Sequence, residues 1–111
     1  MELSHTAQDG VGIIHLRGHL NAESSRALRS IIQELLDGSP RLVLDMQEVD
    51  FIDSTGLGVV VGGLKAAVEK GGNLYIAGLQ RKPRMVFEIT RAHRYFRVFA
   101  TVEEATAAYS A

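Results

Sequence analysis

The residues with the clearest chemical potential form one short run, Asp53-Ser54-Thr55-Gly56-Leu57-Gly58. It places one carboxylate and two hydroxyls just before a stretch with helical apolar spacing. A helix start presents unpaired N–H groups and a partial positive charge, so a phosphate on Ser54 would find electrostatic support there. We expect Asp53 to be ionised and to position the Ser54 hydroxyl, and the glycines to leave room for another protein. The same residue types also fit a purely structural capping role.

Enzymatic interpretations fit this run less well. A hydrolase elbow needs glycine two residues before and two after the serine, and Ile52 occupies the first of these positions. A dinucleotide loop would need glycine at Val61 and an acid after the following strand, near Ala77. We therefore expect no catalytic residue and no cofactor, with a nucleotide-binding or small-anion-binding module at the Gly56 to Gly58 helix end as an alternative.

Two further groups of residues could bind ligands. His15 and His19 offer imidazoles, but the sequence shows no clear third ligand, so we expect no metal. The C-terminal third is locally basic, with Glu88 as the one acid among its cations, and a solvated surface explains it better than a dedicated anion or partner site. These cations are Arg81, Lys82, Arg84, Arg91, Arg94 and Arg97.

The strands that must position the Ser54 run follow from the apolar pattern. Residues 2–17 predict two strands joined by a tight turn at Asp9-Gly10. Leu42-Val43-Leu44 predicts a central strand covered on both faces, after which Val49 to Ile52 leads into a turn. Two further strands are expected at Asn73 to Ala77 and, as a short edge strand, at Tyr95 to Phe99.

Four segments have helical spacing and recognisable ends. The first runs from an Asn21 N-cap to Asp37, the second from Ser54 or Thr55 to Lys70, the third begins near Pro83, and the fourth opens with a capping box from Thr101 to Glu104. The side chains expected to face the core are Leu28, Ile31, Ile32, Leu35 and Leu36, then Val60, Leu64, Ala67 and Val68, then Val86, Phe87 and Ile89.

A hairpin followed by alternating helices and strands predicts an α/β fold. We expect one domain, residues 1–111, with a mixed, mainly parallel sheet of about four to five strands, about four helices and right-handed crossovers. In such a sheet, the end of the central strand is the natural place for a site.

Composition narrows the function classes. With 111 residues, 46% of them hydrophobic, the chain suffices for one core and leaves no room for a second domain. A net charge of −1 gives no overall basic field for nucleic acid or an anionic membrane. Cysteine is absent, and no apolar run approaches the roughly 20 residues of a membrane helix. We expect a cytoplasmic protein that binds neither nucleic acid nor membrane.

The run Phe51 to Gly58, following Leu42-Val43-Leu44-Asp45, resembles the signature of the STAS family of anti-sigma factor antagonists. Other matching segments extend the resemblance over nearly the whole chain: Leu16 to Leu20, Gly71 to Leu74 and Val86 to Thr90. Two features depart from the family pattern. Asn21 stands where many relatives have Asp, which exchanges one good N-cap for another, and Arg91-Ala92-His93 replaces a Gly-Leu-polar stretch.

The resemblance implies a bacterial regulator that works by switching partners. The unphosphorylated protein would bind an anti-sigma factor that is also a serine kinase and so release a sigma factor. Phosphorylation of Ser54 would end that binding, and a Ser/Thr phosphatase would reset it. The partner-binding surface would comprise Asp53, Ser54, Thr55, Gly56, Leu57 and Gly58. A STAS interaction subunit of a non-sigma signalling or lipid-transport assembly is the alternative within the family.

Overall fold

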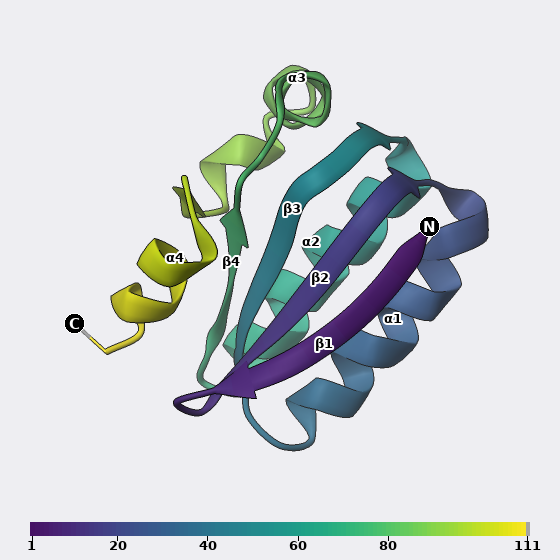
Figure 1. Ribbon diagram of the computed structural model, residues 1–111. Helices are drawn as coiled ribbons and strands as arrows, with labels where there is room; N and C mark the ends of the chain where they lie inside the picture. Colours follow the sequence, from purple (N-terminus) through teal and green to yellow (C-terminus); the bar gives the residue numbers. More distant parts are fainter. Residues whose placement is uncertain (111) are drawn as a thin grey trace.

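The computed structural model describes residues 1–110, in which a five-stranded sheet lies between two layers of helices (Figure 1). The strands follow the order β1-β2-β3-β4-β5; β1 and β2 are antiparallel, and every other neighbouring pair is parallel. The predicted α/β class with a mixed, mainly parallel sheet and an N-terminal hairpin is confirmed. The elements are β1 (Glu2–Gln8), β2 (Val11–Leu20), α1 (Ala22–Leu36), β3 (Arg41–Ile52), α2 (Ser54–Glu69), β4 (Asn73–Ala77), α3 (Arg81–Ile89), the 3₁₀ helix η1 (Ala92–Arg94), β5 (Val98–Phe99) and α4 (Val102–Ala108).

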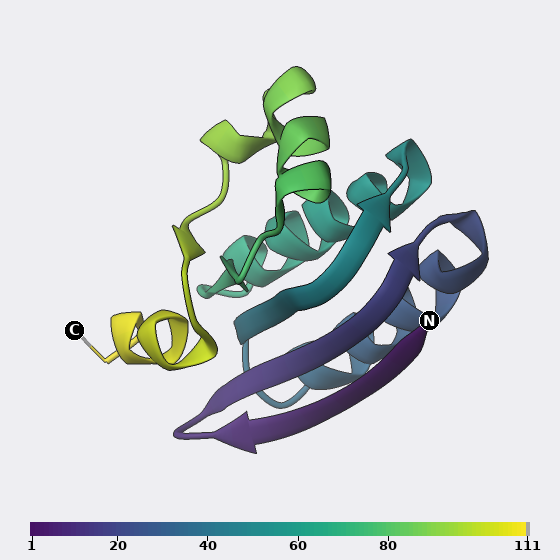
Figure 2. The same cartoon turned by 45° about the horizontal axis from the view of Figure 1, so that its top comes forward.

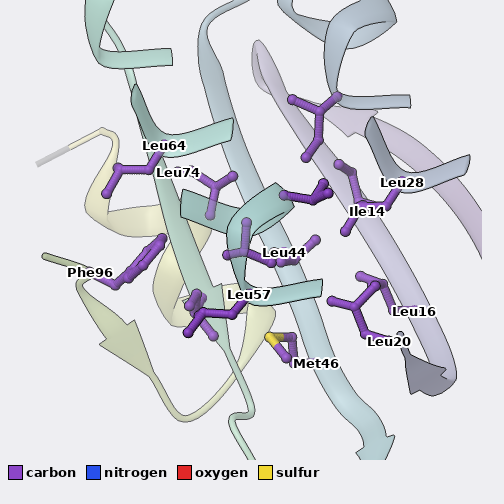
Figure 3. Packing of buried hydrophobic residues seen from close by; sticks show 14 of the residues in the cluster. Ile14, Leu16, Leu20, Leu28, Leu44, Met46, Leu57, Leu64, Leu74 and Phe96 are labelled. Atoms are coloured by element: carbon purple, nitrogen blue, oxygen red, sulfur yellow. The ribbon is translucent and has the colours of Figure 1, made fainter. Parts of the chain in front are cut away.

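Alternate strand residues feed two separate hydrophobic clusters, one on each face of the sheet. The larger cluster joins Ile14, Leu42 and Leu44 to side chains of α1, α2 and α3, and Figure 3 shows its centre. The smaller cluster joins Ile13 and Val43 to Ala105 of α4. Three helices therefore cover one face, whereas α4 covers part of the other. None of the helices in residues 1–110 is long and apolar enough to cross a membrane.

Strand β3 is longer than the sequence pattern predicts. Val49 to Ile52 was expected to lead into a turn, but these residues continue the strand, because Val49 pairs with Gly18 and Ile52 with Leu20 of β2. On its other side, β3 pairs with β4 only from Arg41 to Asp45. Helix α3 packs beside β3 near this unpaired end, as both views of the ribbon show (Figures 1 and 2).

Two predicted core side chains are exposed. The buried stripe of α2 runs through Leu57, Val60, Leu64 and Ala67, and Val68 lies one residue beyond it with 53% of its surface exposed. In α3, the inward residues are Pro83 and Phe87, and Ile89 turns away and is 79% exposed.

The segment around the last strand also differs from the prediction. The edge strand expected at Tyr95 to Phe99 is shorter in the structure, where β5 contains only Val98 and Phe99. Tyr95 instead forms the C-cap of η1. The Asn21 N-cap is confirmed, and it forms a capping box with Ser24. At α4, the Thr101 hydroxyl accepts from the Glu104 N–H at 3.1 Å, which is one half of the predicted capping box; the Glu104 carboxylate does not accept from the Thr101 N–H.

Candidate functional site

Ser54 is the first residue of α2, directly after the end of the central strand β3. The linking residue, Asp53, has an extended backbone and acts as the N-cap. Its N–H donates to the carbonyl of Leu20 at 3.1 Å, so the strand-to-helix turn is attached to the end of β2 as well. Two neighbouring parallel strands thus fix the position of Ser54.

The Asp53 carboxylate caps two helices at once. One oxygen, Oδ1, accepts from the Gly56 N–H at 2.8 Å in α2, and the other, Oδ2, accepts from the Ala22 N–H at 3.2 Å at the start of α1. We had expected this carboxylate to position the Ser54 hydroxyl; in the described residues its hydrogen bonds go to backbone N–H groups instead. Asp53 therefore holds the site together by joining two helix starts.

The predicted run divides into exposed and buried residues. Ser54, Thr55 and Gly58 are exposed, Asp53 is half-buried, and Gly56 and Leu57 are buried. A Cβ on Gly56 would lie 2.5 Å from the Leu20 carbonyl oxygen, so glycine is required there by close packing inside the molecule. A Cβ on Gly58 would meet nothing within 4 Å. Gly58, with Ser54 and Thr55, thus belongs to the face that another protein can reach.

Two backbone N–H groups at the start of α2 have no acceptor in the described residues. Gly56 and Leu57 direct their N–H groups to Asp53, which leaves those of Ser54 and Thr55 without a protein acceptor in residues 1–110. These donors stand at the positive end of a helix of 16 residues. The arrangement favours an anionic group on the serine.

The side chains of His19, at the end of β2, and of Asp50 and Phe51, at the end of β3, lie together, which the sequence pattern did not predict. His19 pairs with Phe51 across the β2–β3 ladder, and their rings lie 5.5 Å apart. His19 Nε2 is 3.2 Å from Asp50 Oδ1, and Phe51 remains 46% exposed. His19 lies in a different segment from Asp50 and Phe51, so no sequence motif joins them and only the strand register brings them together.

The other groups singled out in the sequence have identifiable partners. His15 Nδ1 is 2.9 Å from Asp45 Oδ2, and no group of three or more His, Asp or Glu side chains within residues 1–110 is arranged to hold a metal. The Arg97 guanidinium lies over the rings of Tyr75 and Phe99, at 5.2 and 5.1 Å. Arg84 donates to the Leu79 carbonyl at 3.3 Å. Part of the basic C-terminal third therefore has a structural role.

Comparison with known proteins agrees with this geometry. The STAS domain family matches residues 2–105. The anti-sigma-B factor antagonist of Staphylococcus aureus is 31% identical over 91 residues, covering 81% of this chain and 84% of its own. BtrV of Bordetella bronchiseptica, provisionally named an anti-sigma factor antagonist, is 34% identical over 110 residues, covering 98% and 95%.

The fold also matches that of a solved antagonist. SpoIIAA in its unphosphorylated form superimposes with a TM-score of 0.77 at 19% identity and covers 98% of each chain. The phosphorylated form of the Bacillus SpoIIAA gives a TM-score of 0.77 at 20% identity and covers 97% of this chain and 99% of its own. The match over nearly the whole length and the two relatives above 30% identity lead to one conclusion: this chain belongs to the STAS-domain family of anti-sigma factor antagonists.

Proposed function

We propose that this protein is a partner-switching regulator whose phosphorylation site is Ser54. The unphosphorylated form binds an anti-sigma factor with serine kinase activity, and this binding releases a sigma factor. Phosphorylation of Ser54 ends the binding, and a Ser/Thr phosphatase restores it. The protein contributes a surface and a phosphoacceptor, and the kinase supplies the catalysis.

The observation that carries the proposal is the exposed Ser54 hydroxyl at a helix start whose supporting residues are fixed. Asp53, Gly56 and Leu20 hold the turn from inside, while Ser54, Thr55 and Gly58 face outward. A kinase needs a hydroxyl that it can reach, and a binding partner needs a surface that does not move. The names of the relatives, and the two states in which SpoIIAA was solved, point in the same direction.

The isolated protein should tolerate the phosphate. A phosphoserine adds about −1.5 to −2 charges. The free N–H groups of Ser54 and Thr55 and the helix dipole offset part of this charge, by about 0.3–1 kcal/mol at an exposed site. The nearby Asp53 carboxylate is already bound by two N–H groups, which reduces its repulsion of the phosphate.

The complex should not tolerate it. A partner that covers Ser54, Thr55 and Gly58 would remove water from the phosphate, and an imperfectly paired buried charge costs several kcal/mol. Each 1.4 kcal/mol is about a tenfold change in affinity, so a loss of a hundredfold or more is expected. The same modification is therefore mild for the fold and severe for binding.

The test is to incubate the purified protein with a candidate anti-sigma kinase and ATP and to map the phosphate by mass spectrometry. Ser54→Ala should accept no phosphate, whereas Thr55→Ala, which changes the adjacent exposed hydroxyl, should be phosphorylated as the wild type is. Phosphate on Thr55, or on neither residue with a kinase that binds the protein, would contradict the proposal.

A further inference from the structure

Strand β1 forms a long open edge of the sheet. It pairs with β2 on one side, and its seven residues are exposed except for the half-buried Leu3. The opposite edge strand, β5, has two residues. Proteins usually protect long edges with lysine, proline or a bulge. Between Glu2 and Gln8 there is neither lysine nor proline, and the pairing with β2 runs without a register shift.

The hairpin turn shows which backbone groups of β1 point outward. Asp9 and Gly10 both have positive φ, 55° and 78°, as in a two-residue type I′ turn, and Gln8 pairs with Val11. The pair that closes such a turn is hydrogen-bonded, and hydrogen-bonded pairs alternate along an antiparallel ladder. The N–H and C=O groups of Leu3, His5 and Ala7 are therefore directed away from β2.

We propose that β1 pairs with β1 of a second copy of this chain, antiparallel, about a two-fold axis at His5. In this register, Leu3 of each copy lies opposite Ala7 of the other, and all outward groups form about six backbone hydrogen bonds. Centring the axis on Ser4 or Thr6 would form fewer bonds, about four. The pairing would join the two five-stranded sheets into one continuous sheet.

The side chains of β1 are self-complementary in this register. On one face, Leu3 lies opposite Ala7; on the other, Ser4 lies opposite Thr6 and Glu2 opposite Gln8. The two His5 side chains meet at the axis and, with histidine neutral, no two like charges are directly opposite. The Ser4–Thr6 hydroxyl pair is a favourable cross-strand contact. A strand that fits a copy of itself favours an isologous dimer over an unrelated partner.

The helix-covered side of the edge supplies a second argument. Leu3, Ile31 and Leu35 are only partly buried at the margin of the larger core cluster. Leu35 packs against Gly12, which pairs with Ala7 in β1. An apolar margin thus borders the open edge, and the Leu3 side chain of a second copy, placed opposite Ala7, would cover it.

The dimer leaves the phosphorylation site free. Joining the sheets through antiparallel edges directs the two β3 strands in opposite directions, so the two Ser54 residues lie at opposite ends of the joined sheet. A seven-residue edge buries less area than a permanent interface, so the dimer should be reversible and weak. The inference stands whether or not Ser54 is phosphorylated.

Sedimentation velocity over about 1 to 1,000 µM, the range expected for a small interface, tests the proposal. The wild type should shift from monomer to dimer. His5→Pro removes an outward N–H and should remove the dimer without loss of fold, because edge strands accept proline where the N–H faces solvent. Thr6→Pro is the matched control: it removes an inward N–H and should weaken the fold. Ala7→Lys changes an exposed side chain and places a charge opposite Leu3 of the second copy, so it should remove the dimer and leave the fold intact. It provides the test if His5→Pro does not fold.

Disulfide cross-linking tests the register of the proposed pairing. Because the sequence contains no cysteine, the only thiol is the one that is introduced. His5→Cys places two thiols across the axis at a Cα separation of about 5.5 Å, within the disulfide range. It should form a covalent dimer at least tenfold faster than Ser30→Cys on the exposed side of α1. A wild type that stays monomeric, a dimer unaffected by Ala7→Lys, or equal cross-linking rates would overturn the proposal.

Discussion

Replacing Asp53 tests whether one carboxylate really caps two helices. Its two oxygens accept from Gly56 N–H at 2.8 Å and from Ala22 N–H at 3.2 Å. Loss of an N-cap costs about 0.5–2 kcal/mol, and Asp53→Ala removes two such contacts, so a loss of about 1–4 kcal/mol of unfolding free energy is expected. Asp53→Asn keeps one carbonyl oxygen but turns an NH₂ group toward the second N–H, so it should lose about 1–2 kcal/mol.

Urea unfolding measures this loss directly. At about 1–3 kcal/mol per molar urea for a small domain, Asp53→Asn should lower the midpoint by roughly 0.3–2 M. Ser54→Ala changes an exposed side chain in the same turn without touching either cap and should stay within about 0.5 kcal/mol of the wild type. Equal midpoints for Asp53→Asn and Ser54→Ala would refute the double cap and would leave Asp53 with a role in binding alone.

Three further predictions follow from the site and the core. In calorimetric titrations against the anti-sigma kinase, Ser54→Ala should bind as tightly as the unphosphorylated wild type, and phosphorylated protein at least a hundredfold more weakly; equal affinities would rule out the switch. Gly56→Ala should destabilise the fold by about 1–3 kcal/mol, because its Cβ would lie 2.5 Å from the Leu20 carbonyl oxygen, whereas Gly58→Ala should stabilise the helix by up to about 1 kcal/mol and weaken partner binding; unchanged affinity would remove Gly58 from the partner-binding surface. Tyr109 donates to the Leu42 carbonyl at 2.7 Å, and burial raises the pKa of its phenol above the ordinary 10.0. Since the folded state then holds the proton more tightly than the unfolded chain, stability should fall as pH rises above about 10, and Tyr109→Phe should lose about 1 kcal/mol at neutral pH but show a weaker alkaline decline in thermal unfolding.

Most of the fold was predictable because local signals and tertiary structure agree. Asp9-Gly10 specifies the hairpin turn, Asn21 and Asp53 cap helices, and Asn73 to Ala77 matches β4 residue for residue. The errors occur where a tertiary contact decides. Val49 to Ile52 continues β3 because β2 is present to pair with it, and no local pattern carries that information.

The site was predictable as a sequence position but not as an arrangement of contacts. The Ser54 run follows from hydroxyls and glycines at a helix start. The partners that hold it, Leu20 and Ala22, are more than thirty residues away in the chain and act through backbone atoms, which no side-chain pattern reveals. For the same reason, Gly56 looked like open surface in the sequence, although the Leu20 carbonyl occupies the space beside it.

The contact between Asp53 and Ala22 gives the molecule a built-in reporter. The Ala22 amide is bound to the residue that precedes Ser54, yet it belongs to a different helix. Its NMR chemical shift and its hydrogen-exchange rate should therefore change when the α2 turn is modified or covered. This amide therefore reports on the serine from a helix that does not contain it.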